Sequence, residues 1–186
     1  RLWNINETQA LKIFNGNSSV VRSLAALGSN RFVSGSGDHF IMLWGIHESH
    51  ALKTFAGHSN WVLSLVALGN EHFVSGSRDK SIKYWSVHES QALKTFTGHS
   101  DWVLSLAALD NERFVSGSGD GSVKLWNVHE VKALKTFTGH TDWVLSLAAL
   151  GEENFVSGSG DHSIMLWDIH ESQALKTFTG HTDWVL

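Results

Sequence analysis

The sequence predicts an all-β protein whose four-stranded sheets stack as the blades of a propeller. Three observations support this fold class. Tryptophan, glycine and aspartate positions repeat at a constant interval of 41 residues, apolar residues alternate with polar ones inside each unit, and short turns rich in glycine, serine and aspartate separate the alternating segments. A repeat of this length indicates an architecture in which each unit buries its apolar faces against its neighbours.

Nine tryptophans define the repeat, and they fall into two series. Within each series the spacing is constant, with no insertion or deletion, so every unit has the same length. The first series is Trp3, Trp44, Trp85, Trp126 and Trp167, and the second is Trp61, Trp102, Trp143 and Trp184.

Four segments of one unit, residues 139–179, have the alternation of β-strands. The first is 144–150, and a Gly-Glu-Glu turn separates it from the second, 154–159. A Gly-Asp-His turn leads to the third, 163–169, and a His-Glu-Ser turn leads to the fourth, 173–178. Because β-branched residues fill these segments and no apolar run is long enough for a helix, each unit is predicted to be an antiparallel meander.

Applied to the whole chain, this pattern predicts four complete blades at 15–55, 56–96, 97–137 and 138–178. Partial blades at 1–14 and 179–186 flank them, so the fold is an arc or a fragment of a larger ring. The outermost strand of each blade carries the sequence Ala-Leu-Lys-Thr-Phe. Its lysines, interpreted as charges that discourage edge-to-edge pairing, are Lys53, Lys94, Lys135 and Lys176.

Three short motifs recur in the same order in each unit. In one unit a Gly-His pair stands at 98–99, the stretch SGSGD at 116–120 and the stretch VKLWN at 123–127. In this order and spacing the motifs resemble those of the WD40-repeat family, and the resemblance covers essentially the whole chain. It implies a WD40-type β-propeller.

The resemblance also implies that His, Ser, Asp and Trp of one blade form a hydrogen-bonded tetrad. The Asp would accept from one imidazole nitrogen, the other nitrogen would meet the Ser hydroxyl, and that hydroxyl would accept the indole N–H. A Ser, His and Asp set could also suggest the catalytic triad of a hydrolase. A structural role is the better interpretation, because every buried polar atom has a partner and the same set recurs in tandem copies. The implied tetrads are His58, Ser75, Asp79, Trp85; His99, Ser116, Asp120, Trp126; and His140, Ser157, Asp161, Trp167.

The first complete blade departs from this pattern. Its Gly16 is followed by Asn17, so the tetrad lacks the His, and Val20 stands where the other units have the second tryptophan. The family's Trp-Asp pair occurs in full at Trp167-Asp168. The tetrad does not use that Asp, so its absence elsewhere leaves the predicted fold unchanged.

Propellers of the family bind proteins or peptides on the top face, which carries the loop before the first strand, and the resemblance implies the same here. Tryptophan and arginine are typical anchors of binding surfaces. The candidate partner-binding residues are Trp61, Trp102, Trp143 and Trp184, with Leu63, Leu104 and Leu145 two residues further on, and Arg78 beside the turn Asp. Two interpretations remain open: an aromatic ring that grips a partner, or tryptophans that pack over the neighbouring blade and were copied with the repeat.

Composition excludes several function classes. The net charge of −4 gives no reason to expect nucleic-acid binding, and no apolar run is long enough for membrane insertion. The chain has no cysteine, which fits an intracellular, cytoplasmic protein. Its twelve histidines are mostly Gly-His and turn residues without a metal-binding spacing, so no metal, cofactor or catalytic site is expected.

The predicted function is therefore that of a non-catalytic scaffold for partner proteins or peptides. The alternative is the sensing or targeting propeller of a larger multidomain enzyme or regulatory protein. Because propellers of this family hold about seven blades, four complete ones predict that further blades close the ring. These would come from a longer chain or, as the second choice, from a second copy.

Overall fold

The computed structural model describes residue 2 and residues 9–186, and all regular elements in this part of the chain are β-strands. They form four separate four-stranded antiparallel sheets, each with its strands in chain order, so four complete blades are confirmed. The blades are blade 1, β1 (Val21–Leu27), β2 (Arg31–Ser36), β3 (Ile41–Gly45) and β4 (Lys53–Phe55); blade 2, β5 (Val62–Leu68), β6 (His72–Ser77), β7 (Ile82–Ser86) and β8 (Lys94–Phe96); blade 3, β9 (Val103–Ala108), β10 (Arg113–Ser118), β11 (Val123–Asn127) and β12 (Lys135–Phe137); and blade 4, β13 (Val144–Ala149), β14 (Asn154–Ser159), β15 (Ile164–Asp168) and β16 (Lys176–Phe178). Within the described residues there is no helix with the length and apolar character needed to cross a membrane.

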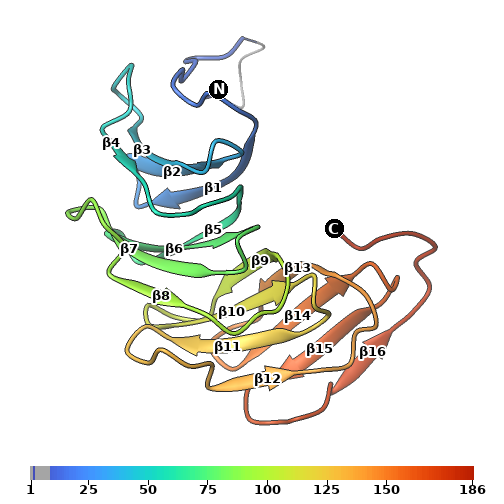
Figure 1. Ribbon diagram of the computed structural model, residues 1–186. Helices are drawn as coiled ribbons and strands as arrows, with labels where there is room; N and C mark the ends of the chain where they lie inside the picture. The colour runs from blue at the N-terminus through green and yellow to red at the C-terminus, as the bar shows by residue number, and fades with distance from the viewer. Residues whose placement is uncertain (1, 3–8) are drawn as a thin grey trace.

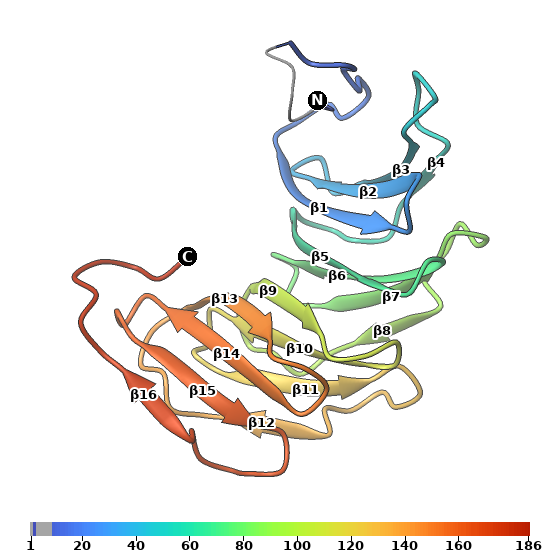
Figure 2. The same ribbon diagram turned by 180° about the vertical axis from the view of Figure 1, so that it is seen from behind.

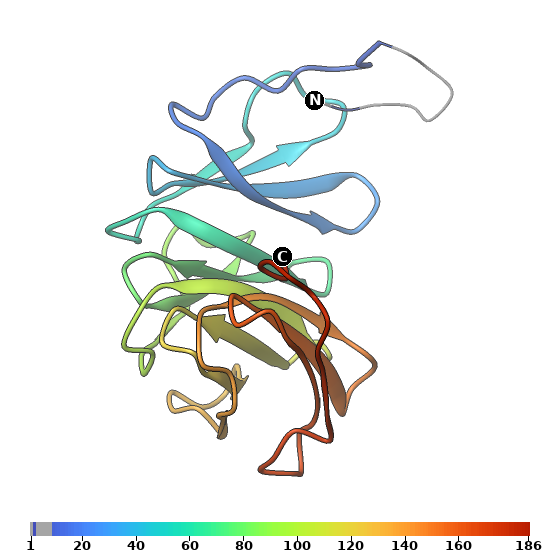
Figure 3. The same ribbon diagram turned by 90° about the vertical axis from the view of Figure 1, so that its right-hand side faces the viewer.

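The blades stack along an arc, with the first strands β1, β5, β9 and β13 on its inner side and the fourth strands on its outer side (Figure 1). From behind, the arc is open between blade 1 and blade 4 (Figure 2). From the side, the blades follow one another in chain order (Figure 3). The described chain is thus an open propeller arc whose inner rim is formed by the first strands and the loops that precede them.

The fourth strands are shorter than expected. The sequence predicts a strand over 173–178, whereas β16 comprises three residues, Lys176–Phe178. In the preceding stretch Leu175 N–H donates to the carbonyl of Leu166, 2.8 Å away, and the Leu175 side chain is exposed. Regular pairing with β15 is limited to Lys176–Phe178, so the outer strand is short.

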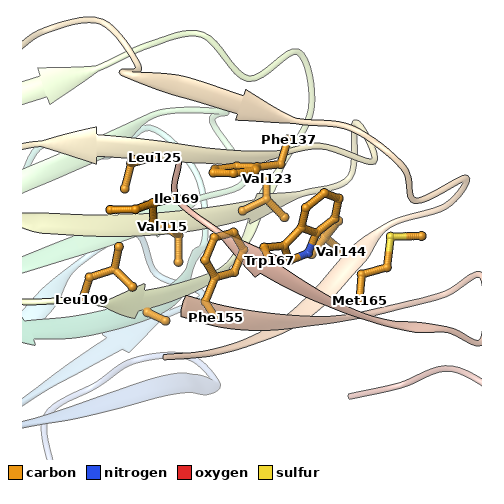
Figure 4. Close-up of a cluster of buried hydrophobic side chains, with 11 residues drawn as sticks. Leu109, Val115, Val123, Leu125, Phe137, Val144, Phe155, Met165, Trp167 and Ile169 are labelled. Carbon is orange, nitrogen blue, oxygen red and sulfur yellow. The ribbon is translucent and has the colours of Figure 1, made fainter. Parts of the chain in front are cut away.

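The apolar core lies between the blades, as stacking requires. Figure 4 shows the cluster between blades 3 and 4, where Phe155 and Trp167 lie beside Phe137, and Ile169 lies beside Leu125. Phe137 of blade 3 meets Phe155 at 5.1 Å and Trp167 at 5.5 Å between ring centroids, both edge to face. The first tryptophan series therefore fills the space between blades, and its described members Trp44, Trp85, Trp126 and Trp167 are fully buried.

Three of the four fourth-strand lysines, Lys53, Lys94 and Lys135, do not stand free at the sheet edge, so the interpretation of them as edge charges was wrong, whereas Lys176 is exposed. Lys53 Nζ donates to the carbonyls of Val87 at 2.7 Å and His88 at 2.9 Å, both in the next blade. In each of β4, β8 and β12 the Lys is half-buried, the Thr exposed and the Phe buried. Strand alternation places Lys on the same face as the buried Phe, so the ammonium group joins neighbouring blades.

The described residues of both partial blades lie against the complete ones. Phe14 packs on Phe32 at 5.0 Å and Trp44 at 5.7 Å, as a fourth-strand Phe does elsewhere. At the other end, Val185 N–H donates to the carbonyl of Ser159 at 3.1 Å. Trp3, predicted in the third strand of the first partial blade, lies outside the described residues.

Candidate functional site

The predicted tetrad residues are brought together in blades 2, 3 and 4. In each blade, the imidazole Nδ1 lies 2.7–2.8 Å from the Asp carboxylate, and Nε2 lies 2.7 Å from the Ser hydroxyl, which accepts the indole N–H at 2.8 Å. The residues so joined are His58, Ser75, Asp79 and Trp85; His99, Ser116, Asp120 and Trp126; and His140, Ser157, Asp161 and Trp167.

Each tetrad carboxylate collects several hydrogen bonds. Burial by itself would raise the pKa of Asp120, but hydrogen bonds from His99, Ser122 and the Ser100 backbone hold it well below its usual range. For Asp161 the same balance, with bonds from Ser163, the Thr141 backbone and His140, lowers the pKa to about 2. The ionised carboxylate thus ties the loop before a blade to the turn between its second and third strands.

The geometry gives the tetrads no open face for a substrate. Ser75, Ser116 and Ser157 are fully buried and already accept the indole N–H. A serine nucleophile needs access to a carbonyl and a free attacking oxygen. The arrangement therefore fits a structural link better than a hydrolase triad.

Blade 1 replaces the imidazole with two side chains. Asn17 Nδ2 donates to Ser34 Oγ at 3.2 Å, and Ser18 donates to Asp38 through its hydroxyl at 2.9 Å and its backbone N–H at 2.8 Å. Trp44 still donates to Ser34 at 2.8 Å. Within the described residues, Asn17 Oδ1 is buried without a hydrogen-bond partner.

The second tryptophan series forms a row along the inner rim. Trp102 lies 5.6 Å from Trp143, and Trp143 lies 6.3 Å from Trp184, measured between ring centroids. Trp61 and Trp102 are half-buried, whereas Trp143 is 37% exposed and Trp184 56% exposed. The row thus becomes more accessible from blade 2 toward the C-terminal segment.

Arginine takes part in this row at its N-terminal end. The guanidinium of Arg78 lies 4.8 Å from the Trp61 ring centroid and 3.6 Å from that of Trp102. Arg22 lies 4.9 Å from the Trp61 ring. The Arg22–Trp61 and Arg78–Trp102 cation–π contacts join neighbouring blades, and the Arg78–Trp61 contact lies within blade 2. Together they extend the row of four tryptophans by two cations.

Sequence reasoning missed Arg22. In the 41-residue register it occupies the position of Leu63, Leu104 and Leu145, and this unusual charge was the available signal. In each first strand the pairing skips this residue, as between Val62 and Ser64, so it is the extra residue of a β-bulge. Bulges re-aim side chains and interrupt alternation. The three leucines are half-buried there. Because the bulge interrupts the alternation, the spacing of two residues does not by itself place a Trp and its Leu on one strand face.

Acidic residues stand beside the other three tryptophans. Asp101, Asp142 and Asp183 each accept the backbone N–H of the following Trp at 2.7–2.8 Å. Before Trp61 the corresponding residue is the neutral Asn60, which accepts in the same way at 2.8 Å. Positive charge therefore gathers at the Arg22 end of the row and negative charge at the Trp184 end.

An open arc of four-stranded blades, pinned by His-Ser-Asp-Trp tetrads, defines a β-propeller repeat protein. The family model described as "WD domain, G-beta repeat" matches residues 8–45, 49–86, 90–127 and 131–168. The chain belongs to the WD40 family. Each match ends on a third strand, so residues 90–127 join β8 of blade 2 to the first three strands of blade 3. No curated protein sequence is similar enough to match.

Among solved structures, the chain is similar to the WD40 β-propeller domain of Doa1. The TM-score is 0.81 at 28% sequence identity, and the match covers 90% of this chain. It covers 57% of the Doa1 chain, so this chain spans little more than half the length of the structure it matches.

Proposed function

We propose that this chain is a non-catalytic interaction scaffold whose inner rim, on the top face, binds a segment of a partner protein. The observation that supports it is the continuous row of Trp102, Trp143 and Trp184, in ring-to-ring contact and increasingly exposed. Exposed contiguous aromatic side chains are typical of binding surfaces, because they offer large apolar area at low entropic cost. Leu63, Leu104 and Leu145 would border this surface as half-buried apolar contacts.

The competing interpretation is that these tryptophans are structural filler. The first tryptophan series shows what filler looks like in this fold, since Trp85, Trp126 and Trp167 are fully buried between blades. Trp61 and Trp102, which lie between complete blades, differ from them in being only half-buried and in lacking a place in the core clusters. Because this difference does not depend on the open end of the arc, it favours a binding role for the row.

The test uses peptides selected against the purified chain from a displayed random library. Trp143→Ala and Trp184→Ala should each weaken binding of the selected peptides by at least about tenfold, with the melting temperature nearly unchanged. The matched controls are Leu93→Ala and Leu134→Ala, which truncate exposed apolar residues next to the outer strands. A large fall in melting temperature without loss of binding would favour structural filler instead.

A second candidate is that the arc is the sensing or targeting part of a larger protein. The end blades favour it, because their outward faces carry apolar residues that are buried at equivalent positions inside the arc. Leu24 is 64% exposed, whereas its blade 2 counterpart Leu65 is 8% exposed. Beside Leu24, a cavity of about 430 Å³ is lined by Phe14, Phe32 and Trp44.

We infer that further blades cover these faces, either from a longer chain or from a second copy. Sedimentation velocity of residues 1–186 distinguishes the two sources. A dimer at micromolar concentration supports the second copy, and a stable monomer with intact tetrads leaves the longer chain as the source. An intracellular location and the absence of nucleic-acid partners stay predictions.

A further inference from the structure

We propose that the N-terminal end of the rim, formed by Arg22, Trp61 and Arg78, is a carboxylate-binding subsite that receives an acidic side chain of the partner segment. Apolar side chains of the same segment would then lie over Trp143 and Trp184. This inference rests on the proposed function and deepens it by naming the chemistry of the partner.

The geometry of the arginines carries the first step. Both guanidinium groups lie on one indole, with Arg22 at 4.9 Å and Arg78 at 4.8 Å from the ring centroid of Trp61. Arg78 is also held against Trp102 at 3.6 Å. A guanidinium stacked on an aromatic ring keeps its N–H edge available for a planar carboxylate, which it binds through two parallel hydrogen bonds.

The second step is the absence of an internal partner. In the part of the chain that the structure describes, no carboxylate lies within 4.0 Å of Arg22 or Arg78, although other cations such as Arg113 have one. The residue before Trp61 is Asn60, whereas Asp precedes each of the other three tryptophans. The N-terminal end of the rim thus carries two arginines, and it has Asn60 at the position where blades 3 and 4 have an aspartate that could neutralise them.

The charge distribution selects an acidic peptide rather than a polyanion. Asp101, Asp142 and Asp183 stand beside the remaining tryptophans. They would repel a phosphodiester backbone that followed the whole row, although its bases would stack well on indoles. A peptide with an acidic residue at one end and neutral apolar residues beyond it places its negative charge on the two arginines and no negative charge beside the aspartates.

The spacing of the row suits an extended peptide. Ring centroids are 5.6 and 6.3 Å apart. Alternate side chains on one face of an extended chain are about 6.6 Å apart, because each residue advances about 3.3 Å. An apolar residue over Trp102 therefore puts the second and fourth residues after it in step with Trp143 and Trp184, and an acidic residue that precedes it on the same face lies toward the arginine end of the row.

The test compares two synthetic peptides, acetyl-Glu-Ser-Leu-Ser-Leu-Ser-Phe-amide and its isosteric Gln counterpart, by isothermal titration of the full chain. The Glu peptide should bind about tenfold more tightly at low salt, and the difference should shrink as ionic strength screens the charges. Arg22→Gln and Arg78→Gly should each reduce the preference and together remove it. Glycine is the matched choice for residue 78, because Gly37, Gly119 and Gly160 occupy that position in the other blades.

The control is Lys132→Gln, which removes one exposed positive charge from an outer turn and should leave the preference intact. Equal binding of the two peptides, with binding of both dependent on Trp143, overturns the carboxylate subsite and leaves the proposed function standing. Failure to bind the Glu peptide, or tighter binding of an oligouridylate of similar length, also overturns it. Binding that is unaffected by Trp143→Ala and Trp184→Ala contradicts the proposed function itself.

Discussion

Blades 1 and 3 are built from the same 41-residue unit, yet they hold their preceding loops differently. In blade 3 one imidazole, that of His99, bridges Asp120 at 2.8 Å and Ser116 at 2.7 Å. In blade 1 this work is divided between Ser18, which donates to Asp38, and Asn17, which reaches Ser34 at 3.2 Å. Two separate side chains reproduce the connections of one histidine.

The comparison separates what the fold needs from what strengthens it. The indole N–H to Ser34 Oγ bond of blade 1 is 2.8 Å long, the same as in the blades with histidine, and Trp44 is fully buried. Stacking of aromatic rings between blades therefore positions the third strand with or without the imidazole. The tetrad adds a link between the loop and the sheet, which should be strongest where both of its ends are buried.

The largest effect is expected from breaking the complete tetrad. His99→Ala removes one buried and one partly buried hydrogen bond and takes one partner from each of Ser116 and Asp120. The free energy of unfolding should fall by about 3 kcal/mol, measured by urea unfolding followed through tryptophan fluorescence. Asn17→Ala, the matched change in blade 1, should lower it by less than about 1 kcal/mol. Equal losses would contradict the division between the two blades.

Acid should weaken the tetrads, because it protonates their carboxylates. The pKa of Asp161 is lowered from 3.8 to about 2, so the unfolded chain binds more protons than the folded one in this range. Stability should thus be full above pH 4 and fall as the pH decreases toward 2. Asp161→Asn should be less stable at neutral pH but should lose part of this slope. Urea unfolding at a series of pH values measures it, and an unchanged slope in the variant would count against the assignment.

Links between blades should contribute less than the tetrads. Lys94 Nζ donates to the carbonyl of Val128 in the next blade. Lys94→Met keeps the apolar stem but removes that bond, and should destabilise the chain by about 1 kcal/mol. Lys176→Met, the same change at the exposed β16, should have little effect in the same urea titration. Similar effects of both changes would show that the blade-to-blade bond adds nothing.

The repeat made most of the fold predictable from sequence, and the residues that escaped prediction act between units. The 41-residue spacing and the strand alternation within one unit predicted the second strand, 154–159, with the bounds of β14. Lys53 was misinterpreted and Arg22 was missed because each makes its contact in the following blade, 34 and 39 residues further along the chain. A pattern within one unit carries no information about which neighbouring group a long side chain reaches.

The smallest expected effect would sharpen the comparison by restoring the histidine. Asn17→His places an imidazole beside Ser34 and Asp38, which already have the geometry of the complete tetrads, and removes the buried Asn17 Oδ1 that has no partner within the described residues. The gain should be no more than about 1 kcal/mol, because Ser18 already donates to Asp38 and one face of blade 1 is open. Hydrogen exchange of the Trp44 indole N–H, followed by NMR, gives a local measure that should slow in the variant. Faster exchange would mean that the Asn17–Ser18 pair stabilises the open blade better than an imidazole does. The imidazole would then stabilise a blade only when a neighbouring blade covers it.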